Sequence, residues 1–186
     1  MGMLTTLERA RTLLRALPED DDLLTLLIPA ASAVIESRCR RKFGYATYAE
    51  TLDGVQGKYL TLRQYPVHVA VVTTAGDEAW TGVELIGDEG MLYRAAGWPC
   101  GDRAVTVSYT AGYKLPNAED GESIPDVVPM LPEDLELACV LMLKHLQREP
   151  GITQERIGDY SVTFSEERVQ MPRAVESLIA PYVRPL

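Results

Sequence analysis

The stretch from Leu131 to Gly151 constrains the fold more than any other part of the sequence. Pro132 suits the first turn of a helix, where its missing N–H has no intrahelical partner, and the acidic residues after it favour the positive end of the helix dipole. An unbroken apolar run extends from Leu137 to Leu143, and Pro150-Gly151 ends the pattern. A helix that is apolar nearly all round must be covered on most sides. We therefore expect this helix to be the central helix of the fold.

Two helices are expected before it. A capping-box pattern starting at Thr5, followed by apolar residues at helical spacing, predicts a helix over Thr6–Ala16. A second apolar stripe continues to the basic residues Arg38–Lys42, and Pro29 inside it should kink the helix or split it. The acidic run at residues 19–22 is expected to cap this second helix rather than to bind a metal ion, because consecutive acids cannot all face one ion.

The apolar period changes to two between Tyr45 and Tyr113. Short alternating segments separated by Gly and Pro predict an antiparallel sheet of about four to six strands, inserted between the helices. Asp53-Gly54 is expected to mark a hairpin turn. Trp80 and Trp98 are expected to be buried anchors, with contact to a partner as the alternative.

A long polar segment at residues 114–130 follows the sheet. Loops of this length in compact domains are usually functional or mobile, and the spacing of its acids fails the calcium-loop pattern, so we expect an arm that touches a neighbouring subunit. After the central helix, residues 157–164 should form a loop and a short strand, and Pro172 should start a last helix.

The predicted fold class is therefore α+β. A small bundle of about four helices, from residues 4–42 and 131–186, surrounds the central helix and carries the antiparallel sheet of residues 45–113 as an insertion. Length and composition are those of a single globular domain over residues 1–186.

The net charge of −9 argues against general nucleic-acid binding, which requires a basic surface. The sequence shows no signal-peptide pattern, its apolar runs are too short to span a bilayer, and its odd number of separated cysteines favours a reducing cytoplasm. No metal or cofactor motif occurs, and nothing in the sequence places Cys100 next to His68 as a nucleophile and base. We expect neither catalysis nor a cofactor.

Short motifs in a fixed order run across nearly the whole chain. They are RRKF at residues 40–43, LRQYPV at 62–67, YTAGY at 109–113, LPEDL at 131–135, ERIGDYSV at 155–162 and APY at 180–182. In this order the chain resembles the head–tail connector (adaptor) family of tailed bacteriophages and prophages.

The resemblance implies a structural virion protein that is assembled in the host cytoplasm. Such adaptors form rings, typically dodecamers, below the portal, where they extend the DNA channel without sequence-specific binding and dock a head-completion, stopper or tail protein. The alternative is a small ligand-binding or regulatory α+β domain. The resemblance also implies that the C-terminal segment contacts the portal. Its residues here are Tyr182, Val183, Arg184, Pro185 and Leu186.

A ring interface joins two different patches, because each subunit contacts its neighbours head to tail. One candidate patch is basic, and the other comes from the acids of the long loop. The basic residues are Arg38, Arg40, Arg41 and Lys42, and the acidic residues are Glu119, Asp120, Glu122 and Asp126.

Overall fold

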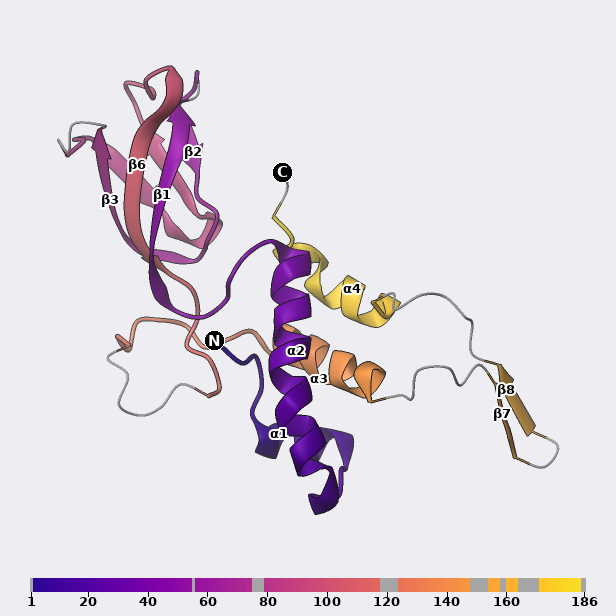
Figure 1. Ribbon diagram of the computed structural model, residues 1–186. Coiled ribbons are helices and arrows are strands. Elements are labelled where there is room, and N and C mark those ends of the chain that lie inside the picture. The colour runs from indigo at the N-terminus through magenta and orange to yellow at the C-terminus, as the bar shows by residue number, and fades with distance from the viewer. Residues whose placement is uncertain are drawn as a thin grey trace. The chain divides into compact units, whose positions relative to one another are not determined.

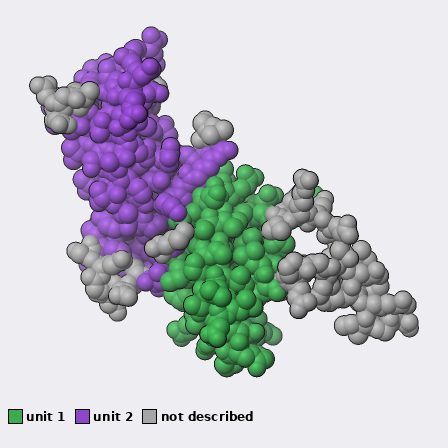
Figure 2. Space-filling view, in the orientation of Figure 1, with its two compact units in different colours: residues 1, 3–39, 132–183 green, residues 2, 40–131, 184–186 purple. Residues whose placement is uncertain are grey.

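The computed structural model describes residues 2–54, 56–74, 79–117, 124–147, 154–157, 160–163 and 171–184. The chain divides into two compact units, which Figure 2 shows in different colours. The helical unit comprises residues 1, 3–39 and 132–183, and the β unit comprises residues 2, 40–131 and 184–186. Each is described by itself. That both act as one domain stays a prediction.

The helical unit contains the four expected α-helices (Figure 1). In chain order they are α1 (Leu7–Leu14), α2 (Asp21–Cys39), α3 (Glu133–Leu146) and α4 (Arg173–Ile179), with short 3-10 turns η1 (Pro18–Asp20) and η3 (Ala180–Tyr182). Two strands between α3 and α4 pair antiparallel, β7 (Gln154–Ile157) with β8 (Tyr160–Thr163), so the expected loop with one strand is a hairpin.

Helix α1 begins one residue later than its capping box predicted. The Thr6 hydroxyl, not that of Thr5, accepts a hydrogen bond from the Arg9 N–H at 3.3 Å and caps the helix. Thr5 is fully buried, and its hydroxyl donates to the Glu136 carboxylate of α3 at 3.0 Å. The Thr5 hydroxyl, which the local pattern assigned to the cap, therefore makes a tertiary contact with α3 instead.

Helix α2 differs from the prediction at two points. Pro29 lies inside a helix that runs without interruption from Asp21 to Cys39, so the proline does not split it. The helix ends before the expected Lys42, because Arg40 adopts a left-handed backbone conformation with φ of 58°. At the other end, Asp21 and Asp22 lie in the first turn of α2, where negative charge suits the helix dipole, and Asp21 pairs with Arg11. The Asp20 carboxylate accepts the Leu17 N–H at 2.9 Å and so caps η1 rather than α2.

Helix α3 is the central helix, as its apolar run predicted. It contacts α1, α2 and α4. Most of its apolar side chains are buried, and Leu137 is the exception at 43% exposure. The buried residues are Leu135, Ala138, Cys139, Val140, Met142 and Leu143.

The β unit holds two three-stranded antiparallel sheets rather than one. The first has the order β1-β6-β3 and the second β2-β5-β4. The strands are β1 (Ala46–Gly54), β2 (Tyr59–Thr61), β3 (Val67–Thr74), β4 (Val83–Ile86), β5 (Met91–Arg94) and β6 (Gly101–Ala111). The short turn η2 (Gly87–Glu89) separates β4 from β5.

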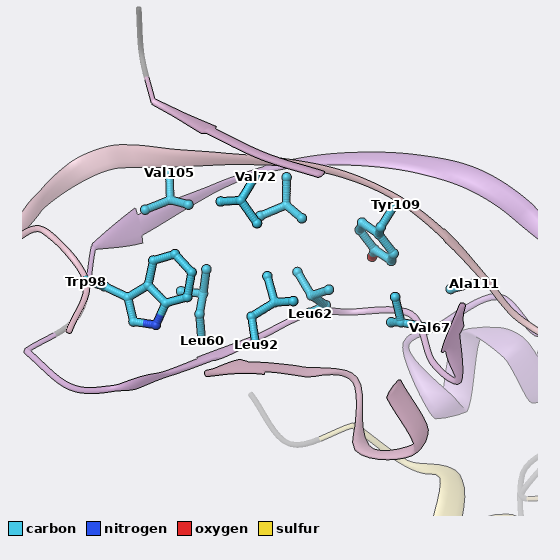
Figure 3. Close-up of a cluster of buried hydrophobic side chains, with 10 residues drawn as sticks. Leu60, Leu62, Val67, Val72, Leu92, Trp98, Val105, Tyr109 and Ala111 are labelled. Carbon is cyan, nitrogen blue, oxygen red and sulfur yellow. The ribbon is translucent and has the colours of Figure 1, made fainter. Parts of the chain in front are cut away.

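The core of the β unit lies between these two sheets (Figure 3). Leu60 and Leu92 come from the second sheet and meet Val72, Val105 and their neighbours from the first. Trp98 is 5% exposed and anchors one end, where its indole N–H donates to the Lys58 carbonyl at 3.1 Å. The anchoring role expected of Trp98 is confirmed, and the Trp80 ring lies tilted beside it with ring centroids 6.1 Å apart.

Asp53-Gly54 does not form a hairpin turn. Strand β1 pairs with β6, while β2 pairs with β5, so the chain crosses from one sheet to the other after Gly54. A Cβ atom at Gly54 would lie 1.6 Å from the Pro99 carbonyl oxygen. Glycine is therefore required here for close backbone approach, not for a hairpin.

The ends of the long polar segment are held in the β unit. The Lys114 N–H donates to the Pro129 carbonyl at 2.8 Å, and the Leu131 N–H donates to the Lys114 carbonyl at 3.0 Å. Leu115 and Val128 are buried. Within its described residues, the segment is thus closed at its base by backbone hydrogen bonds.

Candidate interaction surfaces

Arg41 departs most from its predicted place on a basic surface. It is only 3% exposed, and its guanidinium donates to the Tyr65 carbonyl. The guanidinium lies over the Tyr65 ring at 3.3 Å and over the Phe43 ring at 4.9 Å, distances within the range of cation–π contacts. Arg41 therefore packs inside its own chain and does not contribute to a basic surface.

The other three basic residues are divided between the two units. Arg38 belongs to the helical unit and pairs with Glu176 at 3.7 Å, and both side chains are about half exposed. Arg40 and Lys42 are exposed in the β unit, and the Lys42 N–H donates to the Gln64 side chain at 2.7 Å. The left-handed backbone at Arg40 follows the end of α2, so Lys42 is not four residues after Arg38 on one helix.

Of the four predicted acidic residues, only Asp126 falls in the described part of the loop. It is exposed, beside a turn in which the Val128 N–H donates to the Pro125 carbonyl at 3.0 Å. Glu119, Asp120 and Glu122 lie outside the described residues. The predicted pairing between basic and acidic patches of neighbouring subunits is therefore untested.

The C-terminal residues are engaged with their own chain. The Tyr182 hydroxyl donates to the Asp134 carboxylate at 2.9 Å within the helical unit. The Arg184 guanidinium donates to the Leu62 carbonyl and to the Glu89 carbonyl at 3.3 Å within the β unit. Tyr182 and Arg184 therefore make contacts within their own chain, and a contact of this segment with the portal stays a prediction. Pro185 and Leu186 lie outside the described residues, and Val183 is half-buried.

Tyr65 receives two guanidinium groups in the β unit. Arg184 lies over its ring at 4.6 Å, in addition to Arg41. Burial lowers the pKa of Arg184 from its ordinary value, the Tyr65 phenol opposes this shift, and the charge of Arg41 adds to it. The two guanidinium groups thus lie on one ring and hold three segments of the β unit together, around residues 41, 65 and 184.

A second polar contact lies at the edge of the β core. The Tyr109 hydroxyl donates to the Glu50 carboxylate and accepts the Gln64 N–H at 3.2 Å. Burial raises the pKa of Tyr109 well above its ordinary value, and the hydrogen bond to Glu50 adds to the shift. The phenol is thus kept neutral and serves as a structural crosslink between β1, β6 and the segment before Tyr65.

His68, which was considered as a base beside Cys100, and the buried Cys139 both make structural contacts. The His68 Nε2 atom lies 2.9 Å from the Gly112 carbonyl, and its ring stacks near Tyr45. Cys139 is buried, which raises the pKa of its thiol to about 11, and its Sγ lies 3.7 Å from the Ser32 hydroxyl. Cys100 is exposed. In the part of the chain that the structure describes, no three His, Cys, Asp or Glu side chains are grouped as a metal site.

Sequence reasoning missed the roles of Gln64 and Tyr65. Gln64 is 6% exposed and bonds the backbone of Lys42, while Tyr65 is the ring on which the two arginines lie. Both residues belong to the motif at residues 62–67, but the motif itself does not indicate which residues they contact. No spacing rule reveals them, because their partners are more than twenty residues away in the chain.

None of the described helices is long and apolar enough to cross a bilayer. A four-helix unit with a two-sheet β unit inserted between its second and third helices is an α+β architecture. The side chains of Arg41, Tyr109 and Arg184 donate hydrogen bonds to other parts of their own chain.

The chain belongs to the head completion protein family, whose family model matches residues 3–184. It is thus a structural head–tail connector protein of the virion, as the order of its motifs indicated. No curated protein matches the chain.

Three solved structures share its fold. A chain in a structure described as the neck of an empty GTA particle computed with C6 symmetry is 20% identical, with a TM-score of 0.60 over 98% of this chain and 92% of that one. A chain in a structure described as the neck of a native GTA particle computed with C12 symmetry is 20% identical. Its TM-score is 0.58, over 100% of this chain and 96% of that one. A chain in a structure described as the virion of a native gene transfer agent particle is 22% identical. Its TM-score is 0.59, over 98% of this chain and 92% of that one.

Proposed function

We propose that this protein forms a homo-oligomeric ring at the head–tail interface, next to the portal, through which DNA passes. The likeness to a chain from a particle neck computed with C12 symmetry carries this proposal, because it covers 100% of the present chain. Twelve copies related by rotation form a closed ring with head-to-tail contacts. A stopper or tail protein would dock on the face of the ring that is distal to the portal.

The charge of the chain suits a channel through which DNA moves. With a net charge of −9 per copy, a ring repels the phosphate backbone rather than binding it. DNA would pass without sequence-specific contacts, because readout of bases needs side chains inserted into the grooves.

Charged residues at the subunit boundary would set the register between neighbours. We assign this role to Arg38, Arg40 and Lys42 on one side and to Asp126 with the other loop acids on the next subunit. Rim charges of this kind fix orientation and association rate more than affinity. Charge reversal at Arg40 and Lys42 should therefore slow ring assembly at low salt, and unchanged assembly kinetics would remove this role.

The C-terminal segment, Tyr182–Leu186, is our candidate portal contact. Tyr182 and Arg184 are held by Asp134 and by carbonyls of the β unit, so they would fix the backbone on which the last residues are presented. Removal of Pro185-Leu186 should weaken portal binding while leaving the melting temperature unchanged. Equal co-sedimentation of the truncated and full-length chains with portal would rule out this contact.

Electron microscopy of the purified full chain, alone and mixed with portal, tests the proposed function. We expect rings either in the free protein or on the portal. A protein that stays monomeric at every concentration and never associates with portal would overturn the proposal.

A further inference from the structure

The solvent-facing side of helix α2 carries no charge over most of its length. Leu23, Leu26 and Val34 are 45%, 74% and 38% exposed. The other exposed residues between Leu23 and Ser37 are Thr25, Ala30 and Ser37 itself, and the single charged residue in that stretch, Glu36, is only 5% exposed. Surface helices normally place charged residues opposite the core. Helix α2 has 19 residues, and an uncharged outer side on a helix of this length indicates that another surface covers that side.

The β unit has an equally uncharged surface on the outer side of the β1-β6-β3 sheet. Val105, Val107 and Tyr109 of β6 point into the core, so the residues between them point outward. The strand register places three rows of three residues on that outer side, and all nine are Thr, Ser, Ala or Val. The rows are Thr47–Thr110–Val69, Ala49–Ser108–Val71 and Thr51–Thr106–Thr73.

Two of these residues are conspicuously apolar and open. Val69 is 59% exposed and Val71 is 53% exposed on β3, which is an edge strand. The nearest charge in β1 on this side is Asp53, beyond the last row, where its carboxylate accepts the Arg103 N–H at 2.7 Å. We call the nine residues the sheet face, and we call Leu23, Leu26, Ala30 and Val34 the α2 face.

The charge of the chain identifies the occupant of these faces. Copies that each carry a net charge of −9 repel one another overall, so a close contact between them is favoured where both contacting surfaces lack charge. DNA is excluded as the occupant because neither face offers a Lys or Arg to the phosphates. A head-to-tail ring needs two different complementary surfaces on every subunit, and the chain has one such uncharged surface in each unit.

We propose that the α2 face of one subunit packs against the sheet face of the next subunit in the ring. This inference rests on the proposed ring and names the surfaces that build it. The contact buries leucine and valine side chains of α2 on a flat surface of valine and threonine.

Single charges placed on each face test the contact. Leu26→Glu and Val71→Lys each put an unpaired charge into the proposed interface, and each should weaken ring assembly at least about tenfold. Ala174→Glu on α4 and Thr61→Lys on β2 are the matched controls, because they make the same charge changes at exposed positions outside the two faces. Both controls should assemble as the wild type does. Unchanged circular dichroism and melting temperature show that each variant is folded.

Combining the two substitutions gives a sharper test. If Glu at position 26 of one subunit meets Lys at position 71 of the next, the double variant Leu26→Glu/Val71→Lys should recover part of the assembly that each single variant loses. Assembly of both single variants at the wild-type level would overturn the inference and leave the ring itself standing. Failure of the wild type to form rings, alone or with portal, would instead overturn the proposed function.

Cysteine crosslinking tests the head-to-tail arrangement directly. In a Cys100→Ser background, which removes the exposed native thiol, Leu26→Cys and Val71→Cys are made separately and together. Under mild oxidation, a mixture of the two single variants should give covalent dimers, and the chain with both substitutions should give a ladder. Dimers formed by either single variant alone would show a symmetric contact and overturn the proposal.

Discussion

Replacement of Met142 by alanine should destabilise the helical unit severely. Met142 is 2% exposed on α3, the helix that contacts the other three helices. Truncation of a buried methionine costs roughly 2–5 kcal/mol, from lost transfer free energy and from the cavity that remains. About 3 kcal/mol is reasonable here, and for a chain of this length it lowers the melting temperature by roughly 6–12 °C.

Leu137→Ala on the same helix is the matched control. Leu137 is 43% exposed, so its truncation should cost less than about 1 kcal/mol. Urea unfolding followed by far-UV circular dichroism measures the helices, while fluorescence of Trp80 and Trp98 reports on the β unit, which contains both tryptophans of the chain. A loss for Met142→Ala no greater than that for Leu137→Ala would refute the central position of α3.

Three further predictions follow from the contacts described. Arg184→Ala should lower the melting temperature of the β unit, measured by tryptophan fluorescence, because the variant removes the donors to the Leu62 and Glu89 carbonyls. Arg184→Lys should restore little of this loss, because an ammonium group cannot reproduce the contact of the planar guanidinium with the Tyr65 ring. Thr6→Ala should cost about 1 kcal/mol in urea unfolding through loss of the α1 cap, and a cost below about 0.3 kcal/mol would contradict the assigned cap. Thiol titration of the folded protein near neutral pH should modify Cys100 quickly and Cys139 only on unfolding. Because the pKa of Cys139 is raised to about 11 in the folded state, its contribution to stability is present at neutral pH and is lost as the pH rises from about 9 through 11. Rapid labelling of a second thiol in the folded protein would contradict this burial.

The sequence predicts helices and strands well where one periodic pattern dominates. The apolar run at residues 137–143 identified α3, and the alternating residues around Val67 and Val105 identified β3 and β6. These elements are determined by burial of a continuous face, which leaves a local signature. The strand β4, which lacks such alternation, was not predicted as a separate element.

The failures occur where partners distant in the chain override a local rule. Thr6 caps α1 in place of Thr5, because the Thr5 hydroxyl donates its hydrogen bond to Glu136 of α3. Arg41 ends in the interior because Tyr65 offers both a carbonyl and a ring face. Glu136 is far from Thr5 in the sequence, and Tyr65 is far from Arg41. The spacing of residues along the chain therefore could not predict either contact.

The candidate surfaces show the same division. The sheet face could have been predicted from alternation, because its residues are the outward partners of the core valines once β1, β6 and β3 are paired. The α2 face is visible in the sequence as a long stretch without exposed charge. The predicted basic group assumed that α2 continues through Lys42, but α2 ends at Cys39 and Arg40 adopts a left-handed backbone conformation.

The discontinuity of the helical unit determines the order in which the protein can fold during synthesis. All six strands of the β unit lie between residues 46 and 111, so the nascent chain carries both sheets before any of α3 has been translated. Helices α1 and α2 must wait for α3 and α4, with their apolar residues uncovered in the meantime. Arg184 follows α4 in the chain and donates to the Leu62 and Glu89 carbonyls, so it reaches the β unit only after all six strands have been made.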